Sequence, residues 1–170
     1  MNSPSSRQFG PVELFLVGAI GPPGERSFYL FVQTQQERAW FLFEKTQAAV
    51  LGEQGLDLIS NMGWDDGVSV DDLVAQGADL PEPALDTDVL FRVMSIAMRI
   101  EGEEQMILLL EGQADDERAS FAITALQLRA GAVMALRAVH SGRAQCPECL
   151  LPEDPEGHNC PSGNGHRLPG

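Results

Sequence analysis

Two successive sets of short apolar segments constrain the fold of this chain more than any other feature. Each set holds three strand-length segments rich in aromatic and β-branched residues, bounded by turn residues, and a longer segment with helical periodicity follows each set. The pattern predicts an α+β fold made of two βββα units with antiparallel sheets and two main helices. The predicted strands are residues 12–21, 26–34, 38–45, 91–102, 104–113 and 118–124, and the predicted helices are residues 46–60 and 125–141.

Corresponding positions of the two predicted units are separated by a constant number of residues. Glu44 and Thr124, which each precede a predicted helix, lie 80 positions apart, and so do Leu14 and Met94. A glutamine follows three positions after Glu44 and after Thr124, as in a capping box. We interpret the repeat as an internal duplication of the βββα unit. Coincidence is the alternative, because many α+β domains contain their elements in this order.

Several predicted strands carry apolar residues on both faces. In the stretch SFYLFV, Phe28, Leu30 and Val32 alternate with Tyr29 and Phe31. A sheet covered by helices on one face alone would leave its other face apolar and exposed. That face must therefore meet a second sheet of the same chain, or a second subunit in a homodimer, and the sequence does not choose between them.

The organisation predicted along the chain has four parts. Residues 1–60 form the first βββα unit, residues 61–90 an acidic linker, residues 91–143 the second unit, and residues 144–170 a zinc-binding tail. We expect the two units to form one compact domain. The linker is acidic and interrupted by Gly and Pro, with a short helix predicted near residues 70–76.

The charge balance narrows the class of partner. The chain carries 25 acidic and 11 basic residues, a net charge of −14, which repels nucleic-acid backbones and anionic membranes. The N-terminal stretch has no apolar region of a signal peptide, and no apolar run reaches the roughly 18 residues that span a bilayer. We therefore expect a cytoplasmic protein that binds no membrane, and the charge disfavours nucleic acid as a partner.

The three cysteines all lie in the tail and predict a metal site. They form the pattern Cys146-x2-Cys149-x8-His158-x-Cys160. A Cys-x-x-Cys turn brings two sulfurs to one side, and Cys₃His is a common closed tetrahedral set for structural Zn²⁺. We expect Cys146, Cys149, His158 and Cys160 to bind zinc, with His166 as the alternative fourth ligand. Redox chemistry, an iron–sulfur cluster and a metal-free tail are the competing interpretations.

The chain has none of the common catalytic motifs. It lacks Gly-x-Ser-x-Gly, a Walker loop and His-Glu-x-x-His, which favours a non-enzymatic role. The catalytic candidates are Arg26, Glu44 and Lys45, between the first turn and the first helix. An arginine with a glutamate can bind and activate a polar substrate. The alternative is a plain ion pair at the edge of the sheet.

Two stretches resemble a known family. SGRAQCPECLLPEDPEGHNCPSGNGHR is similar to a family ending of Gly-Arg, Cys-Pro-x-Cys, Asp-Pro-x-Gly-His-x-Cys-Pro and Asn-Gly, and VGAIGPPGERSFYLFVQ is similar to its Gly-x-x-Gly-x-Pro-Gly-x-Arg-x-Phe strand pair. The family comprises conserved hypothetical proteins of actinobacteria and some related bacteria, described as a domain of unknown function. Ser162 stands where an arginine is usual, and His166 where an aromatic residue is common. The resemblance implies that the chain belongs to this family, and it implies no particular activity.

These observations predict an uncharacterised cytoplasmic zinc-binding accessory or protein-interaction protein. Its partner is an unidentified protein, and a homodimer through the open sheet face is a further expectation. The first alternative is an enzyme or small-molecule-binding protein that acts on a polar or phosphorylated metabolite through Arg26 and Glu44. The second alternative is nucleic-acid binding, because sheet-plus-helix units and zinc ribbons both occur in such proteins.

Overall fold

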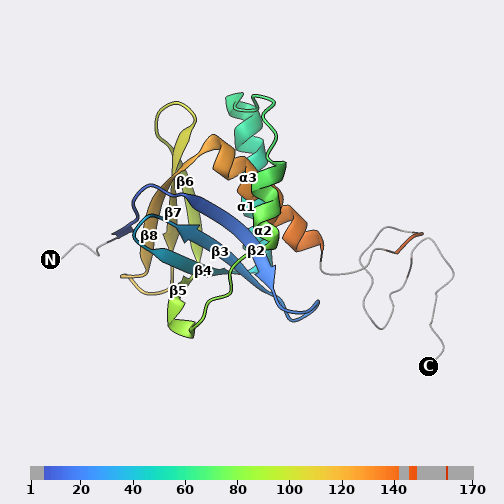
Figure 1. The fold of residues 1–170 in the computed structure, drawn as a ribbon, viewed down its shortest axis with the longest axis horizontal. Helices are drawn as coiled ribbons and strands as arrows, with labels where there is room; N and C mark the ends of the chain where they lie inside the picture. The colour runs from blue at the N-terminus through green and yellow to red at the C-terminus, as the bar shows by residue number, and fades with distance from the viewer. Residues whose placement is uncertain (1–5, 142–145, 149–159, 161–170) are drawn as a thin grey trace.

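The computed structural model describes residues 6–141, 146–148 and 160. This part of the chain holds two four-stranded sheets and three α-helices, so the predicted α+β class is confirmed (Figure 1). The elements in chain order are β1 (Arg7–Gln8), β2 (Leu14–Ile20), β3 (Ser27–Gln33), β4 (Arg38–Phe43), α1 (Lys45–Met62), α2 (Asp71–Ala78), the 3-10 helix η1 (Asp86–Asp88), β5 (Val89–Arg92), β6 (Ser95–Ile100), β7 (Gln105–Glu111), β8 (Arg118–Thr124) and α3 (Ala125–His140).

The two halves of the chain exchange their first strands. β2, β3 and β4 form an antiparallel meander, and β5 from the second half extends it in parallel beside β4. β6, β7 and β8 form the second meander, and β1 from the first half extends it in parallel beside β8. The halves therefore repeat one topology, as the predicted duplication requires, and each completes the sheet of the other.

The single strand predicted over residues 91–102 is wrong. The chain crosses between the sheets at this point, because Val93 N–H donates to Leu42 O at 2.9 Å while Met94 N–H donates to Glu111 O at 2.7 Å. Two adjacent residues thus bond to strands of different sheets. The apolar pattern continues through the crossing and gives no local sign of it.

The chain crosses between the sheets after each exchanged strand, after β5 and after β1. A glutamine in the first turn of each main helix binds one of these two crossing segments. Gln47 Oε1 accepts from Glu44 N–H, and Gln47 Nε2 donates to Val93 O, both at 2.8 Å. Gln127 Oε1 accepts from Thr124 N–H at 3.0 Å, and Gln127 Nε2 donates to Val12 O at 2.9 Å. The predicted cap residues therefore also tie each helix to the segment that follows an exchanged strand.

The core lies between the two sheets. Phe9, Phe41 and Phe121 meet there, with each pair of ring centroids 6.0 to 6.1 Å apart. Phe9 follows β1, while Phe41 and Phe121 belong to opposite sheets, so the sheets share one apolar interior. The apolar faces that the sequence predicts are thus covered within the chain, and the homodimer stays a prediction.

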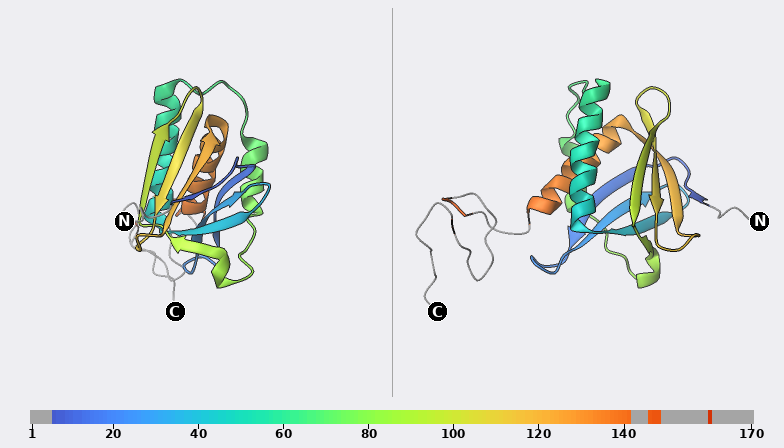
Figure 2. Two further views of the ribbon diagram at one scale, coloured as in Figure 1. Left: turned by 90° about the vertical axis from the view of Figure 1, so that its left-hand side faces the viewer. Right: turned by 180° about the vertical axis from the view of Figure 1, so that it is seen from behind.

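Helices α1 and α3 pack closely against each other beside the sheets (Figure 2). A Cβ atom added at Gly52 would lie 2.6 Å from Leu136 Cγ and 3.0 Å from Ala132 O. Glycine lowers helix propensity at this position, but a side chain would push the two helices apart. The glycine therefore serves the contact between helices.

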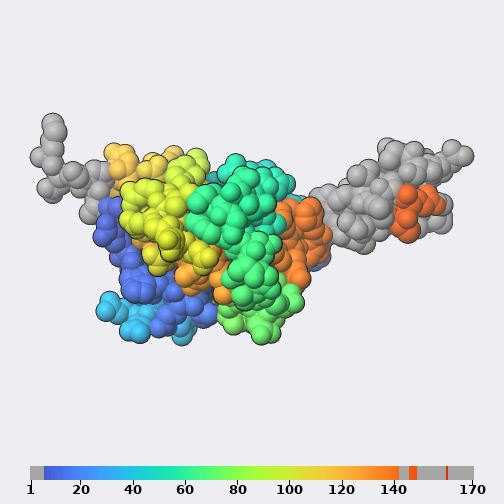
Figure 3. Space-filling view, turned by 90° about the horizontal axis from the view of Figure 1, so that it is seen from above, coloured from blue at the N-terminus to red at the C-terminus, as the bar shows by residue number. Residues whose placement is uncertain are grey.

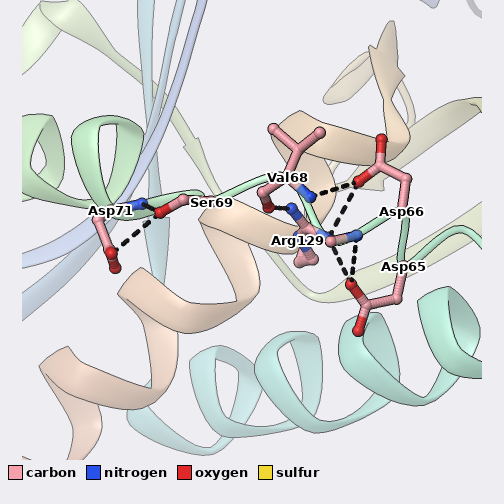
Figure 4. Close-up of polar contacts among 7 residues, drawn as sticks. Asp65, Asp66, Val68, Ser69, Asp71 and Arg129 are labelled. Atoms are coloured by element: carbon pink, nitrogen blue, oxygen red, sulfur yellow. Dashed lines mark hydrogen bonds and ion pairs between the residues drawn. The ribbon is translucent and has the colours of Figure 1, made fainter.

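The acidic segment 61–90 is packed against the rest of the structure. It contains the end of α1 together with α2, and α2 lies against α3 in the space-filling view (Figure 3). Arg129 of α3, 8% exposed, donates to Asp65 Oδ1 at 2.8 Å and to Val68 O (Figure 4). These hydrogen bonds hold the segment that was predicted as a linker against α3. No helix within residues 6–141 is long and apolar enough to cross a membrane.

The glutamine contacts predict a specific loss of stability. Gln127→Ala removes the hydrogen bond to Val12 O and the one to the Thr124 N–H, so we expect a loss of about 1 to 2 kcal/mol in the free energy of unfolding. Urea unfolding measured by circular dichroism gives this value. Gln54→Ala is the matched control, because Gln54 lies exposed on α1 and makes no side-chain hydrogen bond within residues 6–141. Equal stability of the two variants would contradict the assigned role.

Candidate functional site

The three catalytic candidates from the sequence line a single pocket. It has a volume of about 340 Å³ and lies where β4 ends and α1 begins. Arg26, Glu44 and Lys45 all contribute to it. Arg92 at the end of β5 and the last turns of α3 complete its walls. The pocket thus forms only because β5 and α3 of the second half pack against the first half.

Arg26 stands at the turn before β3 and is directed toward the end of α3. Its Nη1 donates to Ser141 Oγ at 2.8 Å. Its Nε is buried and has no hydrogen-bond partner among the described residues. A buried guanidinium N–H without a partner costs free energy.

Glu44 pairs with Arg92 and not with Arg26. The Glu44 carboxylate accepts from Arg92 Nη1, so the ion pair considered from the sequence exists with a different arginine. Both side chains are more than half exposed, at 58% and 55%, so their pairing adds little stability. Arg92 carries no local signal in the sequence, because it reaches the site through the exchange of β5.

Lys45 is the only lysine of the chain and the first residue of α1. Its side chain is exposed, and it forms no ion pair or hydrogen bond with any described residue. The N–H groups in the first turn of a helix have no partner within the helix, which adds a partial positive charge at the same end. Lys45 therefore offers a cation that no described residue neutralises.

The charges in the pocket oppose the charge of the whole chain. Three cations and one carboxylate line it, in a chain with a net charge of −14. None of its lining residues, all in the described part, is a histidine or a cysteine. The arrangement is suited to binding an anion, and it contains no paired nucleophile and base of the kind that covalent catalysis uses.

The structure describes two of the predicted zinc ligands. Cys146 and Cys160 are both buried, with their Sγ atoms 3.8 Å apart, and Cys160 Sγ lies 3.8 Å from Glu148 Oε2. Cys149, His158 and the alternative ligand His166 lie outside the described residues. Among the residues that are described, no group of three or more His, Cys, Asp or Glu side chains could hold a metal ion.

The fold and the pocket define a two-sheet α+β protein with exchanged edge strands and a basic pocket at the start of its first long helix. A family model described as "Protein of unknown function (DUF3090)" matches residues 7–160, so the chain belongs to this family. No curated protein and no solved structure matches the chain. The resemblance seen in the sequence is thus confirmed as far as a domain of unknown function, and membership assigns no activity.

Proposed function

We propose that the protein is a zinc-bearing accessory protein that acts by binding another protein. In this proposal Cys146, Cys149, His158 and Cys160 hold one structural Zn²⁺ in the tail. The distance between Cys146 Sγ and Cys160 Sγ carries the proposal. Zinc–sulfur bonds of about 2.3 Å at tetrahedral angles put two sulfurs about 3.8 Å apart, and the observed distance is 3.8 Å. A disulfide would require about 2.05 Å.

The position of the cysteines favours a structural role for the metal. The apolar core cluster extends from Phe9 to Ala135 and does not include Cys146 or Cys160. The two buried thiols therefore lie outside the main core, and in this proposal the metal would supply the folding free energy of the tail. Four protein ligands would close the coordination sphere and leave no position for a reacting water.

A partner surface is supported on the main domain. β6 forms one edge of its sheet, and Met94 beside it and Ile100 within it are 59% and 44% exposed. A groove of about 410 Å³ lies between β6 and α1, with Val50 on its rim, 45% exposed. An edge strand with exposed apolar side chains is a surface that proteins cover or use for association.

A second candidate function is the binding of a polar small molecule. The observation that favours it is the convergence of Arg26, Lys45 and Arg92 on one pocket. This candidate does not require the metal, and it is compatible with an accessory role.

Metal analysis tests the zinc site. We expect one zinc ion per chain by plasma mass spectrometry, and three thiols that react with a thiol reagent only after a chelator is added. Cys146→Ser should lose the zinc, whereas Ser162→Ala, in the same tail, should keep it. A chain purified in zinc-supplemented medium that holds no metal and exposes all three thiols would contradict the site.

Two variants separate the tail from the β6 edge as the partner surface. If the tail binds the partner, a chain that ends at Ala144 should keep the circular dichroism spectrum of the main domain and lose the protein that co-purifies with the full chain. Met94→Glu should leave that association unchanged. Loss of the partner with Met94→Glu alone would place the contact on β6. If both variants kept every protein that co-purifies with the full chain, both proposed surfaces would be contradicted.

A further inference from the structure

We infer that the pocket of Arg26, Lys45 and Arg92 is a binding site for a phosphate monoester group on a small molecule. The inference deepens the second candidate function above and rests on it, but it is independent of the zinc site. The repeated topology creates two equivalent junctions between the last strand of a meander and the long helix that follows it. One joins β4 to α1, beside the pocket, and the other joins β8 to α3.

The junction between β8 and α3 is closed by a backbone hydrogen bond. Ala125 N–H at the start of α3 donates to Glu104 O, just before β7, at 2.8 Å. The strand registers make Lys45 and Arg26 the equivalents of these residues, because Phe28 pairs with Phe43 as Met106 pairs with Ile123. No corresponding hydrogen bond joins Lys45 and Arg26 within residues 6–141. The first junction is therefore open where the second is closed.

The open junction is also the basic one. At the positions of Arg26 and Lys45, the closed junction has Glu104 and Ala125. Arg92 arrives from the exchanged strand β5 and joins Arg26 and Lys45 around the opening. Three of the 11 basic residues of the chain thus gather at one of two equivalent places. A general requirement of the fold would apply to both junctions, so the fold alone does not explain the opening or its charges.

The charge of the site matches a phosphate monoester. Arg26, Lys45 and Arg92 bring three positive charges, and Glu44 removes one, which leaves a formal charge of +2. A phosphate monoester carries about −1.5 to −2 near neutral pH and presents three acceptor oxygens. Guanidinium groups match such oxygens in geometry, and Arg26 and Arg92 bring two of them to the pocket.

The size of the pocket and the surface around it indicate a small molecule. A volume of about 340 Å³ falls at the lower end of the range of small-molecule sites, about 300 to 1,000 Å³. A nucleic-acid backbone would have to approach a chain with a net charge of −14, which repels successive phosphates. A single phosphate group entering one pocket meets only the local positive charge.

The single lysine permits a direct test on the full chain. Lys45 is the only lysine of the sequence, so acetylation of its side-chain amine by an amine-reactive ester can be followed by peptide mass spectrometry, beside that of the N-terminal amine of the protein. At pH 8 we expect phenyl phosphate to slow acetylation of Lys45 and to leave the N-terminal amine unaffected as an internal reference. Benzoate should slow it less, and neutral benzyl alcohol should not slow it.

Titration of phenyl phosphate by NMR provides the second readout. Lys45→Gln should weaken binding by at least about tenfold, the value expected for one charge-assisted contact. Because Lys45 is exposed and has no partner among the described residues, the variant should fold, and circular dichroism checks this. Arg99→Gln is the matched control, since it removes the same charge from an exposed position on β6, and its affinity should equal that of the unaltered chain.

The outcomes distinguish the inference from the function on which it rests. If benzoate and phenyl phosphate protected Lys45 equally from acetylation and bound with equal affinity, the phosphate assignment would be overturned and a general site for polar molecules would remain. No protection and no binding by either anion would overturn both. Equal weakening by Lys45→Gln and Arg99→Gln would show that net charge, not the pocket, binds the anion, and would likewise overturn the inference.

Discussion

The reciprocal exchange of edge strands is the constraint on which the rest of the structure depends. β5 leaves the second half to pair with β4, and β1 leaves the first half to pair with β8. The hydrogen bonds of Val93 and Met94 to opposite sheets fix the crossing, and the side chains of Gln47 and Gln127 hold the crossing segments to the helices. Neither half has a complete sheet without the other, so the shared Phe core forms only when both are in place.

The candidate site follows from this exchange. Arg92 lies beside Glu44 because β5 is parallel to β4, and Arg26 meets Ser141 because α3 packs beside the first sheet. Both contacts join residues far apart in the sequence. The pocket is thus a property of the joined halves, and the difference between its open junction and the closed one at Ala125 arises from a few residues on the same framework.

The sequence predicts what depends on local pattern. The meander strands are short apolar segments bounded by turn residues, and Gln47 and Gln127 mark the helix starts, so these elements are found close to where they are expected. The two-residue strand β1 has no periodicity to detect, and the break at Val93 depends on pairing with distant strands. Arg92 is missed for the same reason. Of the zinc ligands predicted from spacing, Cys146 and Cys160 lie near each other, while Cys149 and His158 fall outside the described residues.

Native-state hydrogen exchange tests the central claim most directly. If the exchanged strands join the halves into one cooperative unit, the amides of β3 and β7, in the middle of opposite sheets, should exchange through the same global opening. Their opening free energies and denaturant dependence should then agree. A sheet that opens at a free energy several kcal/mol below the other, with a smaller denaturant dependence, would show that the halves fold separately and would contradict the account.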